Sequence, residues 1–285
     1  MLQPPPIVLS FAANDPSGGA GLQADMLTIA SLSCHPLSVM TAITVQDTTG
    51  VDEVMPLDSE WVADQARAVL EDMPVHVFKI GLLGSVEIIA AIAEVISDYP
   101  HIPLVMDPIL TSGRGDELAN EEMIDAMREL LLPQVTILTP NSLEARYLAQ
   151  LDVDSSESRL DLSVCAHRLL DMGCEYVLIT GTHENTTQVK NTLFNAEGIV
   201  RADEWERLEH TYHGSGCTLA SAIAASLANG LSISESVLEA QDYTWHTLQA
   251  GFRPGMGQYI PNRLFWARDI EESEDENGGA AVDKP

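Results

Sequence analysis

The segment His-Gly-Ser-Gly-Cys at residues 213–217 joins a flexible turn to a thiol, and small apolar residues follow it. A Gly-X-Gly turn at the start of a helix directs several backbone N–H groups toward one point, where the helix dipole adds partial positive charge. We therefore expect Gly214, Ser215 and Gly216 to form an anion hole. A tight turn with no ligand would also favour glycine, so the turn alone does not decide between the two.

Cys217 follows this turn directly and falls in the first turn of the expected helix. A helix N-terminus lowers the pKa of a thiol, and a thiolate can take the proton of an attacking hydroxyl group. Cys217 is therefore a candidate catalytic base. Because a thiolate would also repel a phosphate, a role as a neutral positioning group stays open.

Asn141 and Glu144 are three residues apart in Thr-Pro-Asn-Ser-Leu-Glu, where an expected strand gives way to a helix. This spacing suits a capping box, in which the two side chains satisfy the first N–H groups of the helix. It equally suits Mg²⁺, which keeps several waters and needs only one or two carboxylates. Asp107 ends another apolar strand and is a second candidate on the metal or phosphate side, with loop capping as the alternative.

Two further polar residues lie where a small ligand could be bound. Gln46 ends an apolar strand, and its amide can donate and accept together, which suits the edge of an aminopyrimidine; a polar loop residue is the alternative. Asp25 follows a glycine-rich loop at residues 14–21 that lacks both the GxGxxG and the Walker lysine pattern. Asp25 can face a ligand or be a solvated acid on a helix.

These candidates follow elements in which strands and helices alternate. Apolar segments at residues 7–12 and 38–45 predict strands, and residues 188–194 with 199–202 predict a hairpin. Alternation predicts a parallel sheet covered by helices on both faces, with ligands at the carboxyl ends of the strands. We expect a single domain over residues 1–267 and a disordered acidic tail at 268–285.

The overall charge excludes two classes of partner. The formal net charge is −29, with 43 acidic and 14 basic residues, so neither nucleic acid nor an anionic membrane is an expected partner. No apolar run reaches the length of a membrane span, and the first residues carry no basic leader, so we expect a soluble cytoplasmic protein. The excess of acid is also the pattern expected of a surface adapted to a salty cytoplasm.

Six segments occur in an order that is informative as a set: SFAANDPSGGAGLQADMLTIASL, VMTAITVQDTTGV, KIGLLGS, VMDPILTSGRGDEL, TPNSLEA and HGSGCTLASAIAASLANG. Over residues 7–266 the chain resembles the hydroxymethylpyrimidine and phosphomethylpyrimidine kinases of thiamine biosynthesis, in the ribokinase-like superfamily. The resemblance implies a three-layer α/β/α sandwich with a central, mostly parallel sheet. It also implies ATP-dependent phosphorylation of 4-amino-5-hydroxymethyl-2-methylpyrimidine and then of its monophosphate.

The resemblance assigns a role to each candidate residue. It implies that Gln46 reads the pyrimidine edge, that Asp25 lies in the substrate pocket, and that Leu82 and Ile109 form its apolar wall. Residues 214–216 become the anion hole and Cys217 the base. The metal and phosphate residues are Asn141, Glu144 and Asp107, and the ATP-binding residues are Thr180 and Gly181.

The chain departs from the family pattern at Thr180 and Thr182, which replace the lysine and one glycine of Lys-Gly-Gly-His. Loss of that lysine predicts lower turnover or a stronger dependence on Mg²⁺ or K⁺. The implied partners are the pyrimidine and ATP, in a homodimer of the kind common in the family. Two alternatives stay open: a pyridoxal or pyridoxine kinase of the same superfamily, and a homologue that binds ligand with impaired catalysis.

Overall fold

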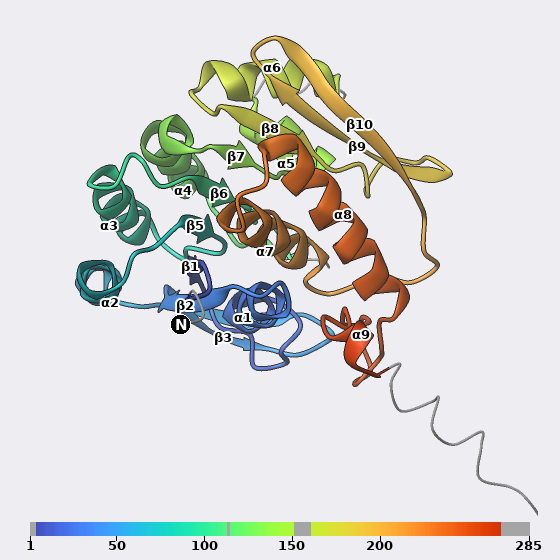
Figure 1. The fold of residues 1–285 in the computed structure, drawn as a ribbon, viewed down its shortest axis with the longest axis horizontal. Coiled ribbons are helices and arrows are strands. Elements are labelled where there is room, and N and C mark those ends of the chain that lie inside the picture. Colours follow the sequence, from blue (N-terminus) through green and yellow to red (C-terminus); the bar gives the residue numbers. More distant parts are fainter. Residues whose placement is uncertain (1–3, 113–114, 151–160, 269–285) are drawn as a thin grey trace, which may run out of the picture.

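The computed structural model describes residues 4–268 apart from 113–114 and 151–160 (Figure 1). The acidic tail, whose disorder we predict, lies outside the described residues from position 269 onward. Within the described part of the chain, no helix combines the length and the apolar character that crossing a membrane requires.

An eight-stranded sheet forms the centre of the molecule, with the strand order β10-β9-β8-β7-β6-β5-β1-β2. Neighbours from β2 to β8 run parallel, whereas β9 and β10 are antiparallel, which confirms the hairpin expected there. The strands are β1 (Ile7–Ala12), β2 (His35–Met40), β5 (Val77–Ile80), β6 (Leu104–Met106), β7 (Ile137–Leu138), β8 (Tyr176–Ile179), β9 (Gln188–Asn195) and β10 (Gly198–Glu206).

Helices cover both faces of this sheet, so successive side chains of a central strand are buried on opposite sides. In β5, Phe78 and Ile80 pack on one helix layer, whereas Val77 packs on the other. The first layer holds α2 (Ser59–Asp72), α3 (Val86–Ser97), α4 (Glu121–Ala126), α5 (Ser142–Leu148) and α6 (Leu162–Asp171); the second holds α1 (Gly21–Ser31), α7 (Ser215–Ala228) and α8 (Ile233–Gln249). The predicted three-layer α/β/α sandwich is confirmed.

The single strand predicted at residues 38–45 is wrong, because the chain leaves the main sheet at Thr41. There the Thr41 hydroxyl donates to the carbonyl oxygen of Leu82 at 2.6 Å and the Thr41 N–H bonds to Ala12. The chain then forms a separate antiparallel pair, β3 (Ala42–Gln46) and β4 (Val51–Pro56). This hairpin lies at the edge of the molecule (Figure 1).

Helix α7 is almost entirely buried, because it packs against the sheet, α1 and α8 at once (Figure 1). Ala220, Ala222 and Ala224 have no exposed surface, so only small side chains fit between these neighbours. The packing of α7 against β5 and β6 fixes its N-terminus near the carboxyl ends of these strands.

Candidate active site

The residues that follow β1, β5, β6, β7 and β8 lie at one edge of the sheet, together with the start of α7. Asp107 is the residue after β6, and its Oδ2 atom lies 3.3 Å from the position that a Cβ on Gly216 would occupy. The carboxylate therefore lies beside the turn at residues 214–216, which we call the anion turn. A side chain at Gly216 would therefore press against the Asp107 carboxylate.

Asp107 carries the ionisation state expected of a general base. Burial, followed by repulsion from the Glu144 carboxylate, raises the pKa of Asp107 to about 7, although the Lys79 ammonium acts in the opposite direction. Its surroundings therefore favour the protonated form of Asp107 more than those of an exposed aspartate do. A base whose pKa lies near the operating pH transfers protons most effectively.

The thiol of Cys217 has the opposite property. The expectation that the start of α7 lowers its pKa is wrong, because burial raises the pKa of Cys217 to about 12 and Lys79 offsets only part of the rise. The nearby carboxylates of Asp107 and Asp25 also disfavour a thiolate, and the thiol hydrogen-bonds to Asp107. The role of Cys217 as a base stays a prediction. Its raised pKa favours the alternative, in which the neutral thiol is a positioning group.

Asn141 and Glu144 form the capping box at the start of α5. The Asn141 side chain accepts the N–H groups of Leu143 and Glu144, and Glu144 Oε2 accepts the N–H of Asn141 at 2.9 Å. Glu144 Oε1 also accepts the N–H of Leu110, which joins α5 to the loop after β6. Burial raises the pKa of Glu144 against the effect of these hydrogen bonds. The capping interpretation is confirmed, and the metal interpretation stays a prediction.

Asp25 lies beneath the site in a buried ion pair. Lys79 Nζ is 2.9 Å from both carboxylate oxygens of Asp25, and Ser221 Oγ donates to Oδ1 at 2.7 Å. Both charged side chains are fully buried, so the interpretation of Asp25 as a solvated helix acid is wrong. The three hydrogen bonds favour a structural role for Asp25, while its contact with substrate stays a prediction.

The predicted apolar wall is assembled as one small cluster. Leu82 packs with Ala13 and Ala42, and Ile109 lies against this cluster. Ile109 has a φ of 31°, a conformation that β-branched residues rarely adopt, so the loop after β6 is strained beside Asp107. The amide of Gln46 is 3.5 Å from the carbonyl oxygen of Asn14, at the same side of the molecule.

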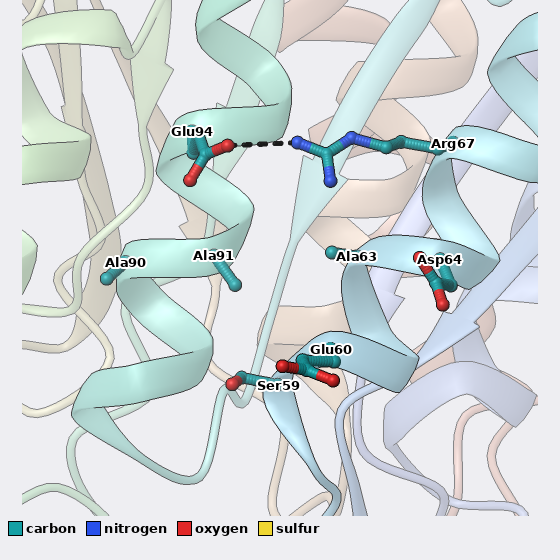
Figure 2. Close-up of a pocket in the computed structure, with 8 residues that line it drawn as sticks. All are labelled: Ser59, Glu60, Ala63, Asp64, Arg67, Ala90, Ala91 and Glu94. Atoms are coloured by element: carbon teal, nitrogen blue, oxygen red, sulfur yellow. Dashed lines mark hydrogen bonds and ion pairs between the residues drawn. The ribbon is translucent and has the colours of Figure 1, made fainter.

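A groove on the outer surface between α2 and α3 does not belong to this site. It is lined by small and charged side chains and bordered by the Arg67–Glu94 ion pair (Figure 2). None of the predicted site residues lines it.

Comparison with known proteins decides the family. The model of the phosphomethylpyrimidine kinase family matches residues 15–262. The chain belongs to this family. A hydroxymethylpyrimidine/phosphomethylpyrimidine kinase of Streptomyces coelicolor is 38% identical over 254 residues, which are 89% of this chain and 92% of the relative. The resemblance described above is thus confirmed, and the protein is a phosphotransferase.

Two solved structures share the fold. The phosphomethylpyrimidine kinase of Clostridium difficile has a TM-score of 0.71 at 33% identity, with 84% of this chain and 97% of that chain covered. The ADP complex of Bacillus subtilis pyridoxal kinase has a TM-score of 0.83 at 26% identity, with coverage of 93% and 99%.

Thr180 stands where the resemblance predicts a lysine, and an arginine from a different segment lies near the residues that follow it. The guanidinium of Arg207, at the end of β10, donates to the carbonyl oxygens of Thr182, Glu184 and Thr186. Gly181 itself is fixed to β9, since its N–H donates to Asn191 and a Cβ would lie 2.3 Å from the Lys190 carbonyl oxygen. Arg207 thus places a positive charge on the loop after β8.

Sequence reasoning missed three charged residues of this kinase site: Lys79, Arg207 and Arg263. Each interacts with a segment far away in the sequence, so its partner cannot be read from its neighbours, even for Lys79 at the start of the KIGLLGS segment. The position of Lys79 inside the otherwise apolar β5 is the one signal in the sequence. A charge buried in a strand requires a partner, so it predicts an acidic residue nearby in the fold.

Proposed function

We propose that the protein transfers the γ-phosphoryl group of ATP to the hydroxymethyl group of 4-amino-5-hydroxymethyl-2-methylpyrimidine, and then phosphorylates the monophosphate. The observation that carries the proposal is the position of Asp107 beside the anion turn. It sets a base with a pKa of about 7 beside a helix N-terminus, in a chain that belongs to the phosphomethylpyrimidine kinase family.

The anion turn is the part that acts on the transferred phosphoryl group. Its backbone N–H groups and the dipole of α7 stabilise the charge that develops on the phosphoryl oxygens. Their orientation is fixed before substrate binds, because α7 is packed on several sides. Asp107 accepts the proton of the attacking hydroxyl, and the neutral Cys217 thiol donates a hydrogen bond to Asp107 and holds it in place.

The residues present fit a magnesium ion that arrives with the nucleotide. Asp107 and Glu144 are two buried carboxylates whose proximity raises the pKa of Asp107, so a cation near them would relieve their repulsion. Among the described residues, no group of three or more acidic, histidine or cysteine side chains could hold a metal unaided. That agrees with Mg²⁺, which takes its remaining ligands from water and phosphate and offsets phosphate charge when bound. Glu144 and Asn141 are the residues that would hold it, so that Asp107 stays able to accept the proton of the hydroxyl group.

The remaining residues bind the two substrates. Gln46 binds the aminopyrimidine edge, and Leu82 and Ile109 form the apolar wall against its ring. Thr180 and Gly181 bind the nucleotide phosphates, with the charge of Arg207 in place of the missing lysine. The ADP complex of the Bacillus subtilis pyridoxal kinase supports a nucleotide site in this fold.

A coupled assay of ADP release tests the proposal. Purified protein with ATP and Mg²⁺ should turn over both the free pyrimidine and its monophosphate. Pyridoxal is the second candidate substrate, because the pyridoxal kinase structure has a higher TM-score than the phosphomethylpyrimidine kinase structure. A larger kcat/KM for pyridoxal than for the pyrimidine would overturn the assignment, and no turnover of either would support the impaired homologue.

We also propose a homodimer. The hairpin β3–β4 exposes three apolar side chains, of which Ile43 and Met55 are directly opposite each other and Val45 is 56% exposed. Sedimentation equilibrium should give twice the mass of the chain, and a purely monomeric protein would contradict this.

A further inference from the structure

Arg263 is a buried arginine near the C-terminal end of the described chain. It is 3% exposed, and its Nε donates to Thr218 Oγ1 at 3.0 Å. Its two terminal nitrogens donate to the carbonyl oxygens of Gly18 and Gly19. Among the ion pairs of the described residues, none includes Arg263.

This arrangement leaves a buried positive charge without a bonded counter-ion. Neutral oxygens satisfy the hydrogen bonds of a guanidinium but do not neutralise its charge, so burial alone is costly. Asp15 and Asp25 attract Arg263 only over a longer range. The charge lies next to the N-terminus of α7, where the helix dipole is also positive. An anion at the anion turn would therefore be attracted by both.

The hydrogen bonds of Arg263 also join the two glycine-rich segments of the site. Thr218 Oγ1, which accepts from Arg263, donates in turn to the carbonyl oxygen of Gly214 at 2.8 Å. A Cβ on Gly214 would lie only 1.9 Å from the carbonyl oxygen of Gly19, so the two segments are in direct backbone contact. Arg263 therefore bonds to one segment through Gly18 and Gly19 and to the other through Thr218.

A second connection between the same segments comes from Asp15. Its Oδ2 atom is 2.8 Å from His213 Nε2 and accepts the N–H of Ala20 at 2.6 Å. Burial raises the pKa of Asp15, but the hydrogen bonds, led by that from His213, outweigh burial and hold the pKa below its ordinary value. A Cβ on Gly19 would lie 2.3 Å from the His213 ring, so this contact leaves no space between the segments.

We propose that Arg263 is a positioning residue for phosphoryl transfer, which holds the glycine loop at residues 18–19 against the anion turn and adds positive charge beneath it. The proposal rests on the proposed function. Arg263 does not touch the substrates, and it acts through Thr218 and the backbone of Gly214. Its loss should therefore reduce kcat while the KM for the pyrimidine stays the same.

The test compares Arg263→Met and Arg263→Ala with the control Arg253→Met. Arg253 lies on the same C-terminal segment, is exposed, and also donates to backbone carbonyls, those of Gly257 and Met256. We expect Arg263→Met to lower kcat roughly 100-fold and to leave the KM for the pyrimidine within about threefold, whereas the control keeps wild-type kinetics.

Chemical rescue is a second measurement on Arg263→Ala. Methylguanidinium at millimolar concentration should raise the kcat of this variant at least about tenfold, because truncation leaves a cavity of matching shape.

A purely structural role predicts a different result. In that case melting temperature would fall, kcat per folded molecule would stay within about threefold of wild type, and methylguanidinium would have no effect; this pattern overturns the proposal. If the Arg263 variants do not fold, Thr218→Val removes the intermediate hydroxyl at nearly constant volume, and the same loss of kcat is expected. A Thr218→Val enzyme with wild-type kcat would then refute the connection. Absence of turnover in the wild type would remove the proposed function as well, so the two failures are distinguishable.

Discussion

The anion turn and the loop after β8 are both expected to face phosphate, yet they are constructed differently. The anion turn lies against buried charges and against a second glycine segment at backbone contact distance. The loop at residues 182–187 is largely exposed, and Arg207 is the side chain that holds its carbonyl oxygens. We therefore expect packing to fix the position of the transferred group, and the exposed loop after β8 to adjust to the nucleotide. Changes at the first should therefore affect kcat and stability, and changes at the second should affect KM.

The largest effect is expected from Asp107→Asn. The amide keeps the size of the side chain but cannot accept the proton of the hydroxyl group, so kcat should fall roughly 1,000-fold. The coupled ADP assay at saturating substrates measures this. A residual kcat within tenfold of wild type would mean that another group accepts the proton. The anion turn would then not be the region in which Asp107 determines kcat.

The next effect is expected from Gly214→Ala, with Gly18→Ala as its matched control. Both glycines have positive φ, 82° and 75°, but a Cβ at Gly18 meets no atom within 4 Å, whereas at Gly214 it would collide with Gly19. We expect a loss of about 3 kcal/mol or more in the free energy of unfolding for Gly214→Ala and about 1 kcal/mol for Gly18→Ala. Urea denaturation measures both, and equal losses would contradict the interlocked packing.

The ionisation of Asp107 predicts a dependence of stability on pH. Its folded pKa of about 7 is raised above the unfolded value of 3.8, so its contribution to stability is present at low pH and is lost as the pH rises through about 7. Asp107→Asn avoids the buried charge. It should be more stable than wild type by up to about 4 kcal/mol at pH 8, and most of this advantage should disappear near pH 4. Urea denaturation with a chelator present measures it, and an advantage that grew toward acid pH would refute the assignment.

A smaller effect is expected at the second region, from Arg207→Met. Loss of three hydrogen bonds to the loop carbonyls and of the nearby charge should raise the KM for ATP about three- to tenfold with little change in kcat. Arg67→Met is the control, because its ion pair with Glu94 lies in the groove between α2 and α3 (Figure 2). If the kcat of Arg207→Met fell as much as its KM for ATP rose, the loop after β8 would also position the transferred group, as the anion turn is expected to do.

The smallest effect is expected from Cys217→Ala. Since the thiol is neutral with a pKa of about 12, its removal should lower kcat less than about tenfold. Steady-state kinetics decides this. A loss as large as that of Asp107→Asn would restore Cys217 as the catalytic base.

Features with local causes could be predicted from the sequence. The Asn141–Glu144 capping box depends on two residues three positions apart, and the β9–β10 hairpin depends on two strands that are adjacent in the sequence. Each could therefore be predicted from one short segment. The first strand was predicted for the same reason. The break at Thr41 was missed, because its hydroxyl bonds to Leu82, a residue that only the fold brings near.

The sequence by itself determined the family, the alternation of strands and helices, and the presence of the anion turn, because backbone preference and periodicity are encoded within short segments. Only the tertiary structure decided how the pKa values of the groups beside that turn are shifted. Burial and charges from distant segments raise the pKa of Asp107 to about 7 and that of Cys217 to about 12. It also decided that Asp25 pairs with Lys79. Arg263 likewise bonds to Gly18, more than 200 positions before it in the sequence, and to Thr218 in the first turn of α7. Desolvation and Coulomb interactions act through space, so they depend on the fold and not on sequence spacing.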